Sequence, residues 1–152
     1  MIKRTNLDFD FELFLAEYNR IKHTEINYAR GGKDAPFWKV IRDKNLDSEL
    51  GWSYAKELKE ELGIPGKINV SFYRLLANET LPWHTDTDTK CSLNFILNAN
   101  EAPVSYESGT YTYRQALINT EIPHMVENGD VDRILYKISI FDLSFEEMEL
   151  LV

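Results

Sequence analysis

Alternating apolar residues in the second half of the sequence constrain the fold most. Every second residue is apolar between Ile68 and Phe72, and again between Ile134 and Ile140, which is the period of a half-buried strand. Further short runs rich in β-forming residues follow, and turn-forming residues such as Gly109 and Asn128-Gly129 separate them. These runs cover residues 92–97, 103–107, 110–114 and 122–126. Short strands at such spacing predict a β-sandwich or barrel over residues 67–142.

The segment before residue 67 carries helical signals instead. Apolar residues recur at helical spacing over residues 11–21, and Asp10 directly before them is a suitable helix N-cap. A second helix is expected over residues 53–62, because Gly63 and Pro65 follow as stop signals.

The flanking segments complete the predicted architecture. Residues 1–66 are expected to be mostly helical, although residues 35–41 are ambiguous and compatible with a short strand. Ser144 and Glu147 form a capping-box pattern, which predicts a closing helix over residues 144–151. No repeat, low-complexity tract or linker divides the sequence. We therefore expect one domain over residues 1–152, mainly β with flanking helices.

Charge and cysteine content narrow the class of partner and compartment. The formal net charge is −8, and a negative surface disfavours general binding to nucleic acid or to anionic membranes. The sequence has no apolar run of the roughly 18–20 residues that a membrane-spanning helix needs. The one cysteine, Cys91, has no partner for an internal disulfide, and we expect a buried structural thiol. These features, with no visible signal peptide, predict a cytoplasmic protein.

Two of the three histidines lie in distinctive settings in the β-rich half. His84 and Asp86 are two residues apart, so in an extended backbone their side chains point to the same side. His124 follows forty residues later in Pro123-His124-Met125-Val126. Two imidazoles and one carboxylate on one face of a metal leave adjacent positions open, as in non-haem Fe(II) oxygenases. Asp88 is a rival ligand, and Asp86 is preferred for its shorter reach to the histidine.

Arg133 is the fourth candidate, nine residues after His124 and at the start of a predicted strand. Its planar guanidinium is suited to a bidentate grip on a carboxylate. Either a simple hairpin or a corner between two facing sheets would bring His124 and Arg133 near each other. The sequence does not choose between these two arrangements.

The whole constellation resembles the 2-oxoglutarate/Fe(II)-dependent dioxygenase superfamily. The order is His84-x-Asp86, then His124 about forty residues on, then Arg133 about ten residues further. The surrounding segments resemble small prolyl-hydroxylase-like and aspartyl/asparaginyl-hydroxylase-like members, some of which bacteriophages encode. The resemblance covers residues 67–142, and the N-terminal segment resembles no family that we can place.

The resemblance implies a double-stranded β-helix, the cupin-like jelly roll, with Fe(II) held by His84, Asp86 and His124. It further implies that Arg133 pairs with the distal carboxylate of the cosubstrate 2-oxoglutarate, while Tyr73 and Asn94 are additional candidates for contacting it. Such enzymes use O₂ to hydroxylate a C–H bond. The substrate would be a small molecule or a protein side chain, and the compartment of a viral member would be the host cytoplasm.

Two other functions stay open at this level. One is a cupin-like metal enzyme that does not use 2-oxoglutarate and so does not need Arg133. The other is a non-enzymatic jelly-roll binding or structural module, because fold does not fix function. Each candidate residue alone also has an ordinary structural explanation, and it is their joint order that favours the oxygenase.

Overall fold

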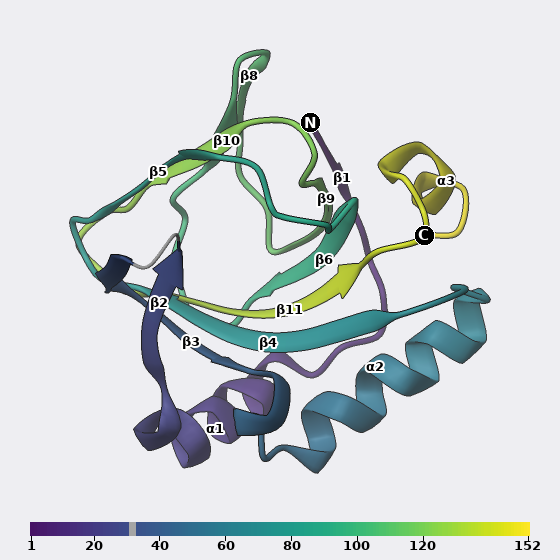
Figure 1. Cartoon of the computed structure of the whole chain (residues 1–152), viewed down its shortest axis with the longest axis horizontal. Helices are drawn as coiled ribbons and strands as arrows, with labels where there is room; N and C mark the ends of the chain where they lie inside the picture. The colour runs from purple at the N-terminus through teal and green to yellow at the C-terminus, as the bar shows by residue number, and fades with distance from the viewer. Residues whose placement is uncertain (31–32) are drawn as a thin grey trace.

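The computed structural model describes residues 1–30 and 33–152. Among these residues two antiparallel sheets face each other, and Figure 1 shows them as stacked layers. The large sheet has the order β1 (Ile2–Arg4), β9 (Gln115–Asn119), β6 (Cys91–Ile96), β11 (Arg133–Ile140), β4 (Ile68–Leu75), β3 (Lys33–Arg42) and β2 (Ile26–Arg30). The small sheet has the order β5 (Thr80–His84), β10 (His124–Glu127), β7 (Val104–Tyr106) and β8 (Gly109–Tyr111).

This arrangement confirms the predicted jelly roll, mainly β with flanking helices. The strands predicted over residues 68–72 and 134–140 are β4 and β11, which pair along their whole length from Arg133 opposite Leu75 to Ile140 opposite Ile68. Strand β9 was not predicted, because all five of its residues are buried and the sequence therefore shows no alternation.

The helices begin where side chains cap them. Helix α1 (Phe11–Ile21) starts after Asp10, whose Oδ1 accepts a hydrogen bond from the Leu13 amide at 3.0 Å. Helix α2 (Glu49–Leu62) starts before the predicted residue 53, because Ser48 caps it, and it ends as expected at Gly63 in the left-handed conformation. Helix α3 (Phe145–Glu149) follows the predicted capping box of Ser144 and Glu147.

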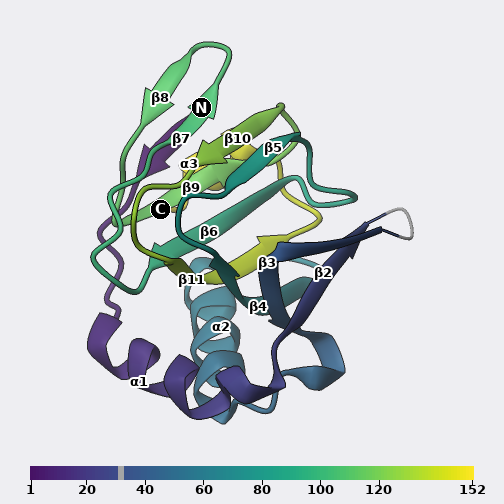
Figure 2. The same cartoon turned by 90° about the vertical axis from the view of Figure 1, so that its left-hand side faces the viewer.

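The prediction of a mostly helical segment before residue 67 is wrong for the stretch between the two helices. Strands β2 and β3 form a hairpin there, with the short 3₁₀ helices η1 (Lys22–Thr24) and η2 (Asp43–Asn45) on either side. The ambiguous residues 35–41 lie in β3, which extends the large sheet by pairing with β4. Figure 2 shows this hairpin at the edge of the large sheet. Strand addition here, rather than a helix, satisfies edge groups of β4 that would otherwise lack hydrogen-bond partners.

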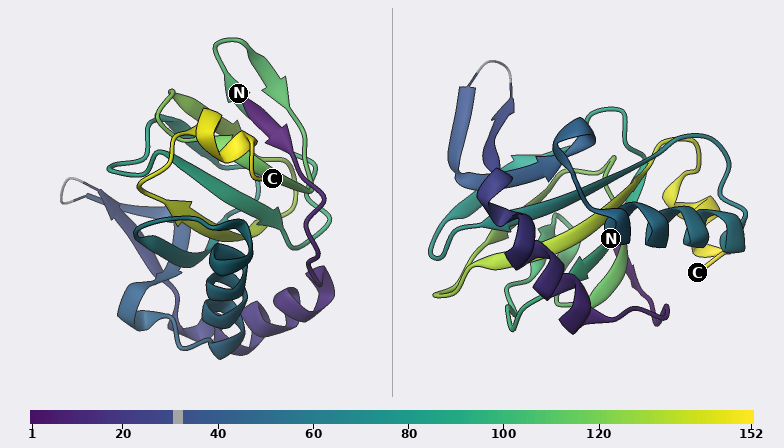
Figure 3. Two further views of the ribbon diagram at one scale, coloured as in Figure 1. Left: turned by 90° about the vertical axis from the view of Figure 1, so that its right-hand side faces the viewer. Right: turned by 90° about the horizontal axis from the view of Figure 1, so that it is seen from below.

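The outer face of the large sheet carries the main core. Helices α1 and α2 lie across this face, as the view from below in Figure 3 shows. Alternate residues of the strands, among them Phe72, Phe95 and Tyr136, are fully buried there. Each such side chain stabilises the fold by about 1.5–3 kcal/mol relative to an exposed one. No helix of the described residues is long and apolar enough to cross a membrane.

The inner face of the large sheet, which faces the small sheet, has a different character. On this face, strands β4 and β11 present the intervening side chains Tyr73, Arg133 and Lys137, which line the space between the sheets. A smaller apolar cluster that includes Leu75, Val104 and Val126 closes part of this space. The pleat thus separates an apolar outer face from an inner face that carries polar and charged groups.

Candidate metal centre

The two predicted histidine ligands are partners in the small sheet. His84 is the last residue of β5, His124 is the first residue of β10, and they lie opposite each other in the antiparallel register. Their ring centroids are 4.3 Å apart. Asp86 lies two residues beyond His84, and its backbone amide donates a hydrogen bond to the Thr120 carbonyl at 3.0 Å, which fixes the chain at this point. The pairing of these two strand ends therefore brings together residues that are forty apart in sequence.

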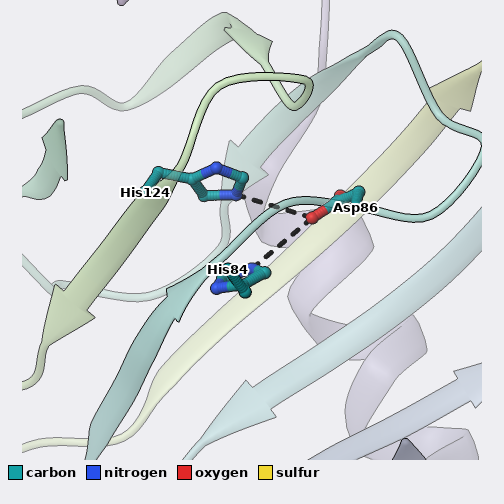
Figure 4. A group of neighbouring side chains, drawn as sticks. All are labelled: His84, Asp86 and His124. Atoms are coloured by element: carbon teal, nitrogen blue, oxygen red, sulfur yellow. Dashed lines mark ion pairs between the residues drawn. The ribbon is translucent and has the colours of Figure 1, made fainter.

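The three side chains point toward one another, as Figure 4 shows. Oδ1 of Asp86 lies 3.4 Å from Nε2 of His84 and 3.5 Å from Nε2 of His124. One candidate ligand atom from each residue lies within 4.8 Å of the others. Metal bonds of about 2 Å to nitrogen and oxygen require ligand atoms gathered at this scale.

Each histidine presents Nε2 to the centre because the backbone holds its other ring nitrogen. Nδ1 of His84 lies 2.7 Å from the Pro82 carbonyl oxygen, and Nδ1 of His124 lies 2.8 Å from the Ile122 carbonyl oxygen. A carbonyl oxygen only accepts hydrogen bonds, so both Nδ1 atoms carry a proton. With Nδ1 protonated, a neutral imidazole has its metal-binding lone pair on Nε2, the atom that faces Oδ1 of Asp86. Two imidazole nitrogens and one carboxylate form a donor set that fits a divalent cation.

Lys137 neutralises the other oxygen of Asp86. Its Nζ donates to Oδ2 at 2.6 Å, and both side chains are nearly buried. Burial alone would raise the pKa of Asp86, but the ammonium of Lys137 and contacts with His124 and His84 together hold that pKa well below its usual range. Burial would lower the pKa of Lys137, but the Asp86 carboxylate outweighs it and the pKa is raised. The carboxylate is thus ionised, as metal binding requires.

Asp88, the rival ligand, lies outside this cluster. It is exposed and adopts a positive φ of 62° in the loop that follows β5. The chain bends at Thr87 and Asp88, so the two-residue alternation that links His84 to Asp86 does not continue to Asp88.

Arg133 comes near the metal centre through a corner between the sheets, not through a hairpin, because His124 belongs to the small sheet and Arg133 to the large one. Its guanidinium is buried, with 4% of the residue exposed. Nη1 donates to the Ala102 carbonyl at 2.6 Å and to Asn100 Oδ1 at 3.2 Å, and Nη2 donates to the Tyr113 hydroxyl at 3.1 Å. No carboxylate of the described residues forms an ion pair with it, and a buried charge without a counter-ion is costly.

Arg133 and the three candidate ligands line one cavity, which we call the inner cavity. The cavity and its open mouth together enclose about 590 Å³ that protein atoms do not fill. The predicted residues Tyr73 and Asn94 line it as well. Burial raises the pKa of Tyr73, and no hydrogen bond joins its hydroxyl to another described residue. The cavity therefore offers a protonated phenol and a guanidinium to an anionic ligand.

Two residues of the inner cavity were not predicted for these roles. Lys137 lies four residues after Arg133 on β11, so both point to the same face of the strand, and this spacing was the available signal. The Tyr113 hydroxyl accepts hydrogen bonds from Arg133 and, at 3.3 Å, from Asn94. Its own proton is left to donate elsewhere.

Comparison by sequence gives no match, either to a family profile or to a curated protein. Comparison by structure does give matches. A Pseudomonas putida prolyl-4-hydroxylase superposes with a TM-score of 0.63, 13% identity and coverage of 86% of this chain and 85% of that chain. The viral collagen prolyl hydroxylase of Paramecium Bursaria Chlorella virus-1, solved as a 2OG complex, superposes with a TM-score of 0.56, 11% identity and coverage of 70% and 80%.

At these identities the similarity establishes the fold. The protein is a double-stranded β-helix of the kind seen in prolyl hydroxylases, and between its sheets it carries a cluster of two histidines and one aspartate that could hold a metal ion. The resemblance drawn from sequence motifs and the similarity of structure therefore agree.

Proposed function

We propose that this protein is a non-haem Fe(II), 2-oxoglutarate-dependent oxygenase that hydroxylates a small molecule or a protein side chain. One observation carries the proposal. The inner cavity joins a cluster of three candidate metal ligands to a buried arginine that lacks a counter-ion among the described residues. A dicarboxylate in this cavity would bind the metal with one end and pair with the charge of Arg133 at the other.

His84, Asp86 and His124 would hold the metal. When bound, Fe(II) supplies the activation of O₂ that is coupled to oxidation of 2-oxoglutarate to succinate and CO₂. Three protein ligands on one face leave adjacent positions for the cosubstrate and O₂. Lys137 holds Oδ2 of Asp86 in an ion pair, which would leave Oδ1 as the oxygen available to the metal.

Arg133 would bind the distal carboxylate of 2-oxoglutarate. Its charge compensates the carboxylate in a site where the low dielectric strengthens the attraction. Tyr113, whose oxygen already accepts two hydrogen bonds, can donate its proton to the same carboxylate. Tyr73 and Asn94 line the same cavity and would contact the cosubstrate along it, while the apolar side chains of Leu75, Val104 and Leu135 would exclude water.

The test is anaerobic titration of the Fe(II)-loaded protein with 2-oxoglutarate, followed by the weak visible charge-transfer band that such chelates give. The wild type is expected to develop the band and to saturate. Arg133→Met should retain Fe(II) but bind 2-oxoglutarate at least about 100-fold more weakly, because a charged hydrogen-bonded contact of about 3 kcal/mol is lost. The matched control is Arg114→Met, since Arg114 is exposed and lies over the Phe11 ring, away from the cavity.

Absence of 2-oxoglutarate binding to the iron-loaded wild type would overturn the proposal. Metal binding without it would instead select a metal enzyme of this fold that does not use 2-oxoglutarate. Absence of any metal binding would select the non-enzymatic alternative.

A further inference from the structure

A second cavity, which we call the distal groove, opens on the other side of the metal centre. It has a volume of about 720 Å³ with its mouth included. It shares with the inner cavity the side chains of Trp38, Tyr73, His84, Asp86 and Lys137. A molecule in the distal groove would therefore lie against the candidate metal ligands without occupying the space beside Arg133.

The floor of the distal groove is made of small hydroxyl side chains. Ser71 of β4 and Ser139 of β11 lie on the inner face of the large sheet and are nearly buried, with 4% and 9% exposed. No hydrogen bond joins either hydroxyl to another described residue. Neither hydroxyl oxygen is a sealed atom without a partner among the described residues, so both oxygens are accessible from the distal groove and free to contact a polar ligand.

The outer end of the distal groove carries two opposite charges side by side. Nε of Arg42 lies 3.8 Å from Oδ2 of Asp43, while the terminal nitrogens of Arg42 make no hydrogen bond with the described residues. Asp43 adopts a positive φ of 56°, which is uncommon outside glycine. The side-chain amide of Asn69 holds Asp43 in this conformation by donating a hydrogen bond to its Oδ1 at 2.7 Å. Backbone strain of this kind persists when the surrounding structure fixes it, and it clusters at ligand sites.

An adjacent guanidinium and carboxylate are complementary to the head group of a free α-amino acid. The α-carboxylate would accept from the free nitrogens of Arg42, and the α-ammonium would donate to Asp43. A residue inside a peptide has neutral amides at both positions and would use neither charge. A polyanion would be repelled by Asp43.

We infer that the substrate is a free α-amino acid with a polar side chain, bound by Arg42 and Asp43 at its head group. This inference rests on the proposed function. The side chain would run over Ser71 and Ser139 toward His84 and Asp86. One oxygen atom of O₂ would enter a C–H bond of that side chain to give C–OH, and the other would enter succinate as 2-oxoglutarate loses CO₂.

The experiment uses the Fe(II)-loaded protein with 2-oxoglutarate under anaerobic conditions, so that binding is observed without turnover. Each proteinogenic L-amino acid is added in free form and, in parallel, as its N-acetyl amide, which lacks both charges. At least one free polar amino acid is expected to shift the visible band and to saturate, and its blocked form is expected to bind at least about 10-fold more weakly. Isothermal titration calorimetry gives the same affinities independently.

Arg42→Met and Asp43→Asn should each weaken binding of the free amino acid by at least about 10-fold and leave 2-oxoglutarate binding unchanged. The control variant is Lys44→Met, because Lys44 is an exposed neighbour that does not line the distal groove. If the band with 2-oxoglutarate never forms, the proposed function fails and this inference falls with it. If the band forms but no free amino acid perturbs it, or the blocked forms or short peptides bind as tightly, only the substrate inference is overturned.

Discussion

The two oxygens of Asp86 are divided between Lys137 and the histidine pair. Lys137 Nζ lies 2.6 Å from Oδ2, whereas Oδ1 faces both Nε2 atoms. Lys137 also lies over the Tyr73 ring, with Nζ 5.4 Å from the ring centroid. One buried cation thus positions the candidate metal ligand and packs against a wall of the inner cavity.

Removal of Lys137 is expected to destabilise the metal-free protein. Lys137→Met leaves the buried carboxylate of Asp86 without a counter-ion, which costs about 3–5 kcal/mol in the free energy of unfolding. The double variant Asp86→Asn, Lys137→Met should lose less than the sum of the single variants by about 1–3 kcal/mol. Urea unfolding of the four proteins measures this, with the exposed Lys56→Met as control. Strict additivity would show that the two residues do not interact.

Stability of the metal-free protein should fall in acid partly through Asp86. The pKa of Asp86 is lowered in the folded protein, so below about pH 4, near the pKa of about 3.9 of an unfolded aspartate, the unfolded state binds more protons than the folded state. The contribution is therefore present above that pH and lost as the pH falls. Asp86→Asn removes this contribution, so the free energy of unfolding of the variant should decline less steeply than that of the wild type between about pH 5 and pH 2. Equal slopes for the two proteins would argue against an ionised, stabilised carboxylate.

Tyr73→Phe separates cosubstrate binding from packing. The phenyl ring can keep the stacking on Trp38, whose centroid lies 5.1 Å away, so the free energy of unfolding should hardly change. Loss of a hydrogen bond to a carboxylate costs about 1.5–3 kcal/mol and should weaken 2-oxoglutarate binding about 10-fold to 100-fold. Calorimetric titration of the metal-loaded protein checks this, with Tyr111→Phe as a control hydroxyl on β8. Unchanged affinity would remove Tyr73 from the cosubstrate site.

Cys91 should react with thiol reagents only when the protein unfolds. Its side chain is fully buried, and burial, with smaller effects from Glu121 and Glu146, raises the pKa of the thiol to about 12. At pH 8 a free cysteine of pKa about 8.5 reacts readily, because a large fraction is thiolate. The reaction with Ellman's reagent should therefore be slow in buffer and accelerate steeply in urea. Fast labelling of the native protein would contradict the buried position.

The metal cluster could be predicted from sequence because two of its three residues, His84 and Asp86, are close neighbours in the chain. His84 and Asp86 sit two residues apart next to a strand end, and this spacing alone places them on one side. The position of His124 opposite His84 depends on how β5 and β10 pair. Their register is irregular between His124 and Val126. The resemblance supplied that pairing, since no local pattern encodes it.

Other features of the fold could not be predicted from sequence, because tertiary contacts override the local residue pattern. Strand β9 is buried on both faces, and the β2–β3 hairpin is stabilised by its addition to β4. Lys137 was missed because a lysine in an antiparallel strand usually faces solvent, whereas here the facing sheet buries it. The distal groove depends on all of these elements at once, and so only the folded protein shows it.

Equilibrium dialysis against Fe(II) under anaerobic conditions tests the central claim most directly, because it counts the ions that each molecule holds. The wild type and Asp88→Ala are expected to bind one Fe(II) per molecule. His84→Ala, Asp86→Ala and His124→Ala, each shown to be folded by circular dichroism, are expected to lose it. Retention of the ion by His124→Ala, or absence of binding by the wild type, would contradict the account.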